Sequence, residues 1–184
     1  MQIKAMKNTV CTLTNTLKVA VLSMVMIFSS VPAFAIGVDA DDFIAKASAS
    51  GVAEIETGKI ALQKTTYPEI KDFAKKMIEN NASLNKDLRA LAAKKGVEIA
   101  DDAELLDQAK AYVLQQREGE SFDVAYVNNQ IDTHRATIKL YEDASSSTDE
   151  DVRQLAATSL PRLEQHLEQA EALVEIIARG SAAN

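Results

Sequence analysis

The sequence predicts an all-α protein: a bundle of four long helices, with a shorter fifth helix in the long connection between the second and the third. Two observations support this fold class. The chain is rich in Ala, Leu, Glu, Lys and Gln, which favour helices, and only 5% of its residues are aromatic. Apolar residues recur at spacings of three and four, whereas no segment shows the sustained two-residue alternation of a half-buried strand.

The first two long helices have clear start and stop signals. We expect the first over about 41–65. The second follows a predicted capping box at 66–69, Thr-Tyr-Pro-Glu, in which a threonine and a glutamate satisfy backbone donors. It ends at Gly96, after Lys94 and Lys95, because glycine accommodates the left-handed cap and the two cations suit the negative end of the helix dipole.

The remaining helices follow from similar signals. A shorter helix is expected over about 102–117. The next long helix starts at Ser121 and ends in the serine run 145–147. The last extends over 148–180 with Pro161 inside it. Proline removes one backbone donor and crowds the preceding turn, so we expect a bend there and not a clean break.

The amino-terminal segment, residues 1–35, is predicted to be a cleaved signal peptide. Three lysines and no acid precede the apolar run 19–34, and small residues at 33–35, Ala-Phe-Ala, suit a signal peptidase. The alternative is a retained anchor, but the run contains three serines and a proline and is shorter than the roughly 20 apolar residues of a spanning helix. We therefore expect one exported domain over 36–184 and no retained transmembrane helix.

Removal of this segment changes the charge and the chemistry of the chain. The three lysines leave with it, so the net charge moves from -7 to -10. Nucleic acid is then not an expected partner, because phosphate binding needs a basic surface. The only cysteine, Cys11, lies in the removed segment, ahead of the apolar run. A lipid anchor, disulfides, thiolate catalysis and cysteine metal sites are therefore not expected in the mature chain.

The apolar stripes of the long helices are interrupted by polar residues. Glu54 lies beside two glycines on the first helix, Asn81 interrupts the stripe of the second, and His134 lies between two isoleucines on the third. His166 lies at the edge of the fourth stripe, a boundary position. The inward stripes predicted for the third and fourth helices are Val124, Val127, Ile131, His134, Ile138 and Tyr141, and Ala156, Leu160, Leu163, Leu167, Ala170, Val174 and Ile177.

These four polar residues are predicted to lie in one layer. Each is near the middle of its helix, so their heights along the bundle agree whichever way each helix runs. With a rise of about 1.5 Å per residue, an error of two or three residues in a helix end moves a side chain by only about 3 to 5 Å.

Four blocks of the chain resemble a known family. They are FIAKASASGVAEIETGKIALQK, IKDFAKKMIENN, FDVAYVNNQIDTHRATIKLYEDA and LAATSLPRLEQHLEQA. In order and spacing they look like the blocks of a large family of exported bacterial proteins catalogued as domain of unknown function 4142. Its members are often labelled outer membrane proteins, and the resemblance implies a ferritin-like bundle. It matches Glu54, His134 and His166 to the acid and the two histidines of the family pattern.

The second block departs from that pattern, because this chain has Asn80-Asn81 where the family commonly has Asp-His. A metal site shared with the family would therefore lack one imidazole here. The family has no settled activity that the resemblance could lend to this chain.

The residue set limits the chemistry. Di-iron carboxylate bundles need a glutamate on each of two helices and Glu-x-x-His on each of two others, and this chain has Ile131 and Leu163 three residues before its histidines. One carboxylate with two imidazoles, from Glu54, His134 and His166, would suit a single zinc, iron or copper ion, with Asn81 in the same layer. More often, polar residues in such stripes bond one another and fix the register of the bundle.

Two functions follow, in this order. The leading prediction is a non-enzymatic cell-envelope protein, periplasmic or associated with the outer membrane, that binds an envelope partner or a small ligand and carries no cofactor. The alternative is a mononuclear metal-binding protein or oxidoreductase that uses Glu54, His134 and His166.

Overall fold

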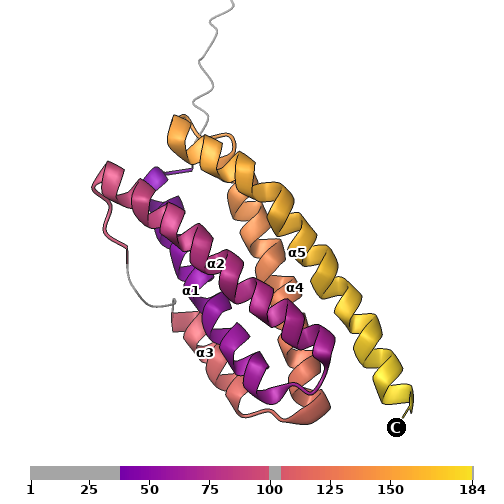
Figure 1. Cartoon of the computed structure of the whole chain (residues 1–184). Helices are drawn as coiled ribbons and strands as arrows, with labels where there is room; N and C mark the ends of the chain where they lie inside the picture. The colour runs from indigo at the N-terminus through magenta and orange to yellow at the C-terminus, as the bar shows by residue number, and fades with distance from the viewer. Residues whose placement is uncertain (1–37, 100–104, 184) are drawn as a thin grey trace, which may run out of the picture. The chain divides into compact units, whose positions relative to one another are not determined.

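Five α-helices make up most of the computed structural model, which describes residues 38–99 and 105–183. They are α1 (Ala40–Lys64), α2 (Pro68–Lys95), α3 (Leu105–Gln115), α4 (Gly119–Ala144) and α5 (Glu150–Ala183) (Figure 1). No strand occurs in those two ranges, so the predicted all-α fold of four long helices and one short helix is confirmed. The signal peptide expected over 1–35 lies outside them. No helix in the described part is long and apolar enough to cross a membrane.

The four long helices form a ring. α1 packs against α2 and α4, and α5 packs against α4 and α2 (Figure 1). Of these four pairs, α2 and α5 contact each other least. The chain returns along the bundle between α2 and α4 through α3, which packs on α1 and α4. A helical bundle with one long crossover of this kind has the ferritin-like architecture.

The start of α2 corrects one prediction. The helix begins at Pro68, with Tyr67 as its N-cap and no side-chain capping bond, so the predicted capping box does not form. Proline suits the first helical position because its missing N–H would have no helical partner there. The Thr65 hydroxyl instead accepts a hydrogen bond from the backbone N–H of Tyr67, just before the helix, at 3.2 Å. The predicted end is confirmed: Gly96 caps α2 with φ of 73°.

The other helix ends lie close to their predicted positions. Asp39 caps α1 by accepting from the backbone N–H groups of residues 41 and 42. Asp149 does the same for α5, accepting from residues 151 and 152 at 3.1 and 3.2 Å. α4 starts at Gly119, two residues earlier than predicted. α5 continues through the exposed Pro161, as expected for a helix that is not broken there.

The interior contains two hydrophobic clusters, one toward each end of the bundle. The first comprises Phe43, Ile44, Ala47, Leu88, Leu91, Ala92, Tyr141, Ala144, Val152, Ala156 and Leu163. The second comprises Ile60, Ala61, Ile70, Phe73, Ala74, Met77, Ala111, Leu114, Phe122, Tyr126, Val127, Ile131, Ala170, Leu173 and Ile177. α1 and α5 pass from the first cluster to the second, whereas α2 and α4 pass from the second to the first. Neighbouring long helices in the ring are therefore antiparallel.

Two predicted inward positions face solvent instead. Val124 on α4 is 41% exposed and Val174 on α5 is 42% exposed. Leu173 is buried in place of Val174, so the inner face of α5 is rotated by about one residue relative to the prediction. The same rotation turns His166 from the expected boundary to the interior, where it is only 3% exposed.

Candidate functional site

A layer of polar side chains separates the two hydrophobic clusters. The four residues singled out from the sequence all lie in it and are buried: Glu54, His134 and His166 are each 3% exposed and Asn81 is 8% exposed. In each long helix the polar residue falls between the part that enters one cluster and the part that enters the other. The structure thus places the four at the same level of the bundle.

The two histidines face each other across the boundary between α4 and α5. Their ring centroids are 5.5 Å apart and their planes meet at 85°. His134 Nδ1 lies 2.8 Å from the backbone oxygen of Gln130. A carbonyl oxygen only accepts hydrogen bonds, so Nδ1 carries the proton and Nε2 keeps its lone pair. Burial lowers the pKa of His134, and the bond to Gln130 opposes this.

His166 is held from the other side by α2. Its Nε2 lies 2.9 Å from Asn80 Nδ2, which donates to it, and its buried Nδ1 has no hydrogen-bond partner. Burial, together with the charges of His134, Arg162 and Lys76, lowers the pKa of His166 to about 4. Both imidazoles are therefore neutral at pH 7, with one ring nitrogen each that no hydrogen bond occupies.

Glu54 belongs to a different part of the layer. Burial raises its pKa to about 8; a favourable interaction with the Gln130 side chain opposes the rise, Asp107 adds to it and Lys110 reduces it. Neither carboxyl oxygen of Glu54, neither amide atom of Gln130, nor the Tyr126 hydroxyl has a partner at hydrogen-bond geometry. Burial raises the pKa of the Tyr126 hydroxyl, and the charge of Glu54 raises it further.

The structure therefore brings together two of the three predicted metal ligands. Among residues 38–99 and 105–183, no three His, Cys, Asp or Glu side chains gather to hold an ion. Glu54 faces α3 and the Tyr126 side of α4, while the histidines face α5 and α2. A site built from Glu54, His134 and His166 together does not form in this arrangement.

Asn81 lies in the polar layer as predicted, but its neighbour Asn80 makes the contact with the histidine. Asn81 Nδ2 donates to the oxygen of Met77, one turn earlier on α2, at 2.9 Å. The contact with His166 comes from Asn80, which the apolar stripe did not single out. Its position beside Asn81 and the family pattern Asp-His were the only sequence signals that could have found it.

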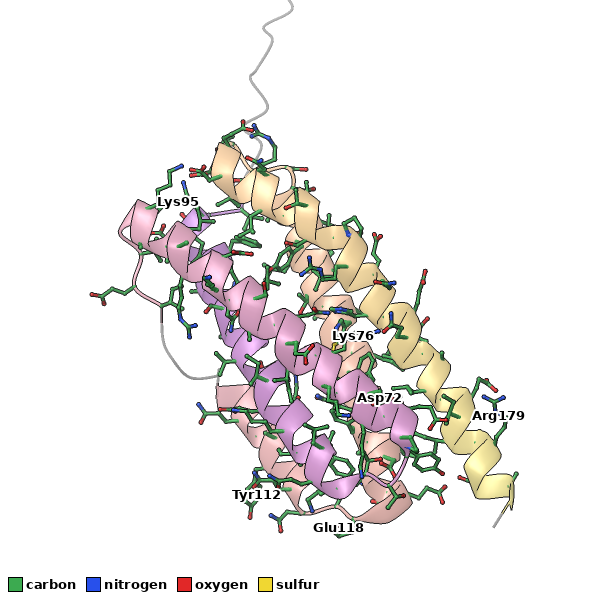
Figure 2. The ribbon with its side chains drawn as sticks, in the orientation of Figure 1. Asp72, Lys76, Lys95, Tyr112, Glu118 and Arg179 are labelled. Atoms are coloured by element: carbon green, nitrogen blue, oxygen red, sulfur yellow. The ribbon has the colours of Figure 1, made fainter. Side chains whose placement is uncertain are left out.

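A cavity of about 150 Å³ connects the layer to the surface between α2 and α5. It lies where the ring of helices packs most loosely. Its lining residues are Asn80, Asn81, Leu84, Asp87, Leu155, Thr158, Ser159, Arg162, Leu163 and His166. Lys76, one turn before Asn80, also faces α5 and donates to Gln169 at 2.8 Å (Figure 2). His166 is thus reached from outside through this cavity, whereas His134 does not line it.

Further buried polar groups were missed from the sequence. Gln130 is fully buried one turn before His134, on the same face of α4, so helical spacing could have found it. Asn85 lies one turn after Asn81 and donates to the oxygen of Ser48 at 3.3 Å. It packs against Gly51, where a Cβ would lie 2.2 Å from Asn85 Oδ1. A side chain of α2 therefore approaches the α1 backbone closely at this glycine.

Comparison with known proteins gives a family and a fold. A family model described as domain of unknown function (DUF4142) matches residues 29–173. The crystal structure of a secreted DUF305 protein from Streptomyces coelicolor is similar, with a TM-score of 0.65 and 15% identity over 76% of this chain and 94% of that chain. CopM in its Cu(I)-bound form has a TM-score of 0.62 and 17% identity over 74% of this chain and 95% of its own. No curated protein matches the sequence. At these identities the two structures show a shared helical fold.

Proposed function

The chain belongs to the family described as domain of unknown function DUF4142, and from that premise we propose that it is an exported, non-enzymatic cell-envelope protein that binds a small ligand in its polar layer. The observation that carries this proposal is the cavity between α2 and α5, which ends on the buried ring of His166. Ligand sites are typically concave, with a few polar groups that converge on the ligand.

The size of the cavity favours a small ligand over a protein partner. Its volume of about 150 Å³ is similar to that of an engineered cavity, also about 150 Å³, that binds benzene. Its lining includes the buried His166, the half-buried Asn80 and the exposed Arg162. An ion with its hydration water, or a molecule of a few heavy atoms, fits this space and these donors.

Filling the cavity tests the proposal. We expect Ser159→Trp to remove any ligand that the protein carries from its host, because Ser159 is half-buried and lines the cavity. Ala157→Trp is the matched control, since Ala157 is exposed on the same helix and does not line it. Native mass spectrometry of the protein from its own compartment measures the ligand as added mass. Equal added mass in both variants, or none in the wild type, would count against the proposal.

A second candidate function, metal binding, is favoured by the histidine pair. Metal–nitrogen bonds of about 2 Å to one shared ion would place two imidazole centroids no more than about 6.5 Å apart, and these centroids are 5.5 Å apart. One nitrogen of each ring is free of hydrogen bonds. CopM, which has the same fold, is known in a Cu(I)-bound form. Elemental analysis of the purified protein distinguishes a metal from an organic ligand.

Export is the remaining part of the proposal, and it rests on the small residues 33–35 after an apolar run. We expect the protein isolated from its host to begin at Ile36 and to be found in the periplasm or at the outer membrane. Intact-mass measurement checks the first residue. A chain that still carries residues 1–35 in the membrane fraction would contradict the proposed localisation.

A further inference from the structure

We propose that the ligand is a soft monovalent metal ion, Cu(I), bound by His134 and His166 alone, with Asn80 as the residue that positions the second imidazole. This inference rests on the metal-binding form of the proposed function and names the ion, its two ligands and the residue that orients one of them.

The small number of ligands favours Cu(I) over divalent ions. The two histidines offer two neutral nitrogens, and no carboxylate joins them in the described part of the chain. Zn(II) normally takes four ligands in a tetrahedral arrangement, and a di-iron or Mg(II) site needs anionic oxygen. Cu(I) has a filled d shell and is stable with only two nitrogen ligands, so a pair of imidazoles suffices for it.

The surrounding charge acts in the same direction. Arg162 and Asp87 line the cavity together with His166, and Lys76 reaches α5, where it donates to Gln169 at 2.8 Å, so positive charges outnumber negative ones on this side of the ring. Coulomb repulsion scales with the charge of the ion, so a divalent cation meets about twice the repulsion of a monovalent one. Glu54, whose charge could have compensated, lies among Gln130, Asp107 and Lys110 instead.

Hydrogen bonds restrict which nitrogen each ring can offer to an ion. His134 donates from Nδ1 to the Gln130 oxygen at 2.8 Å, so its Nε2 has the free lone pair. The bond between Asn80 and His166 uses Nε2 of that ring, so the nitrogen left for an ion is Nδ1. With the Asn80 amide turned by 180°, its oxygen accepts from Nε2–H, and Nδ1 then carries the lone pair.

Asn80 therefore controls whether His166 is ready to bind. In the structure, its NH₂ group donates to Nε2 and keeps the proton on Nδ1. An aspartate at this position can only accept, so it would hold the proton on Nε2 and leave Nδ1 free, as carboxylate partners of metal-bound histidines do. A leucine at this position makes no hydrogen bond, so it would leave the His166 ring without a group that orients it.

A competition titration tests the proposal. Protein from the export compartment is mixed, without oxygen and with ascorbate, with the coloured Cu(I) complex of bicinchoninate. We expect wild type to withdraw one Cu(I) per chain and Zn(II) in tenfold excess not to displace it. Background sites are few, because residues 36–184 contain no cysteine, two histidines and one methionine. Glu54→Gln should withdraw the same amount, since Glu54 is not a ligand in this proposal.

The Asn80 variants test the positioning residue. Asn80→Asp should bind Cu(I) more tightly than wild type and Asn80→Leu more weakly, by about 10- to 100-fold between the two. Asn80 is half-buried beside the cavity, so both variants should fold, which circular dichroism checks. Equal affinity of the two variants, loss of binding in Glu54→Gln, or displacement by Zn(II) would overturn the proposal. If wild type withdraws no Cu(I) but still carries a mass that Ser159→Trp removes, this inference fails and the proposed function stands.

Discussion

Replacing Glu54 by glutamine is expected to remove most of the pH dependence of stability above pH 6.5. Burial raises the pKa of Glu54 from 4.5 to about 8, so the folded protein holds this proton at pH values where the unfolded chain has lost it. Stability from this group is then complete below pH 4.5 and is lost as the pH rises through about 8. Between pH 6.5 and 9 the wild type should lose roughly 2 kcal/mol. The variant should lose little.

At pH 9 the difference between the two proteins should be largest. Wild type must then keep an ionised carboxylate among Gln130, Tyr126 and the α3 side chains, whereas glutamine is neutral and of the same shape. We expect Glu54→Gln to be more stable by roughly 3 to 5 kcal/mol at that pH. Urea unfolding at several pH values measures both slopes, and the exposed Glu79→Gln serves as the control. Parallel profiles for wild type and Glu54→Gln would show that Glu54 is not buried as described.

The second large effect separates binding from folding. His134→Leu should abolish ligand binding, a loss larger than the roughly 10- to 100-fold caused by replacing a residue that only orients a metal ligand. Its stability should stay equal or increase by up to about 1 kcal/mol. In the described part of the chain the ring makes its hydrogen bond to the Gln130 oxygen of the same helix, which keeps its helical hydrogen bond, so the substitution leaves no buried hydrogen-bonding group unpaired. His166→Leu should behave similarly, because half-buried Asn80 can turn to water.

Thermal unfolding and the Cu(I) competition, measured on both leucine variants, check this separation. A destabilisation of several kcal/mol in His134→Leu would indicate that the ring has a structural partner that the geometry does not show. Unchanged Cu(I) binding in both variants would remove the histidines from the site. The Ala157→Trp protein is again a suitable control, since it alters an exposed position of α5.

The sequence was sufficient for the fold because its signals are local. Apolar spacing and helix ends define α1, α2, α4 and α5, and counting from those ends places Glu54, Asn81, His134 and His166 at one level. The level is insensitive to small errors, since each residue contributes only about 1.5 Å of rise. The existence of a buried polar layer was therefore predictable without knowledge of how the helices pack.

The partners within that layer depend on helix rotation, which the sequence does not determine. α5 carries leucines on both sides of His166, and contact with α4 and α2 selects the face with Leu173 and turns Val174 outward. The same kind of choice directs Glu54 toward α3. Asn80 lies outside the apolar stripe of α2 and reaches His166 sideways, so stripe periodicity selected its neighbour instead.

The most direct test of the histidine pair is the ¹⁵N spectrum of its imidazole nitrogens. With two histidines in the chain, only four signals are expected. Before addition of metal, His134 should show a protonated Nδ1 and an unprotonated Nε2. One equivalent of Cu(I), added with ascorbate under nitrogen, should shift one nitrogen of each ring, Nε2 of His134 and Nδ1 of His166, and leave the other two protonated. Four signals that stay in place after one equivalent of Cu(I) would contradict a binding site at these two residues.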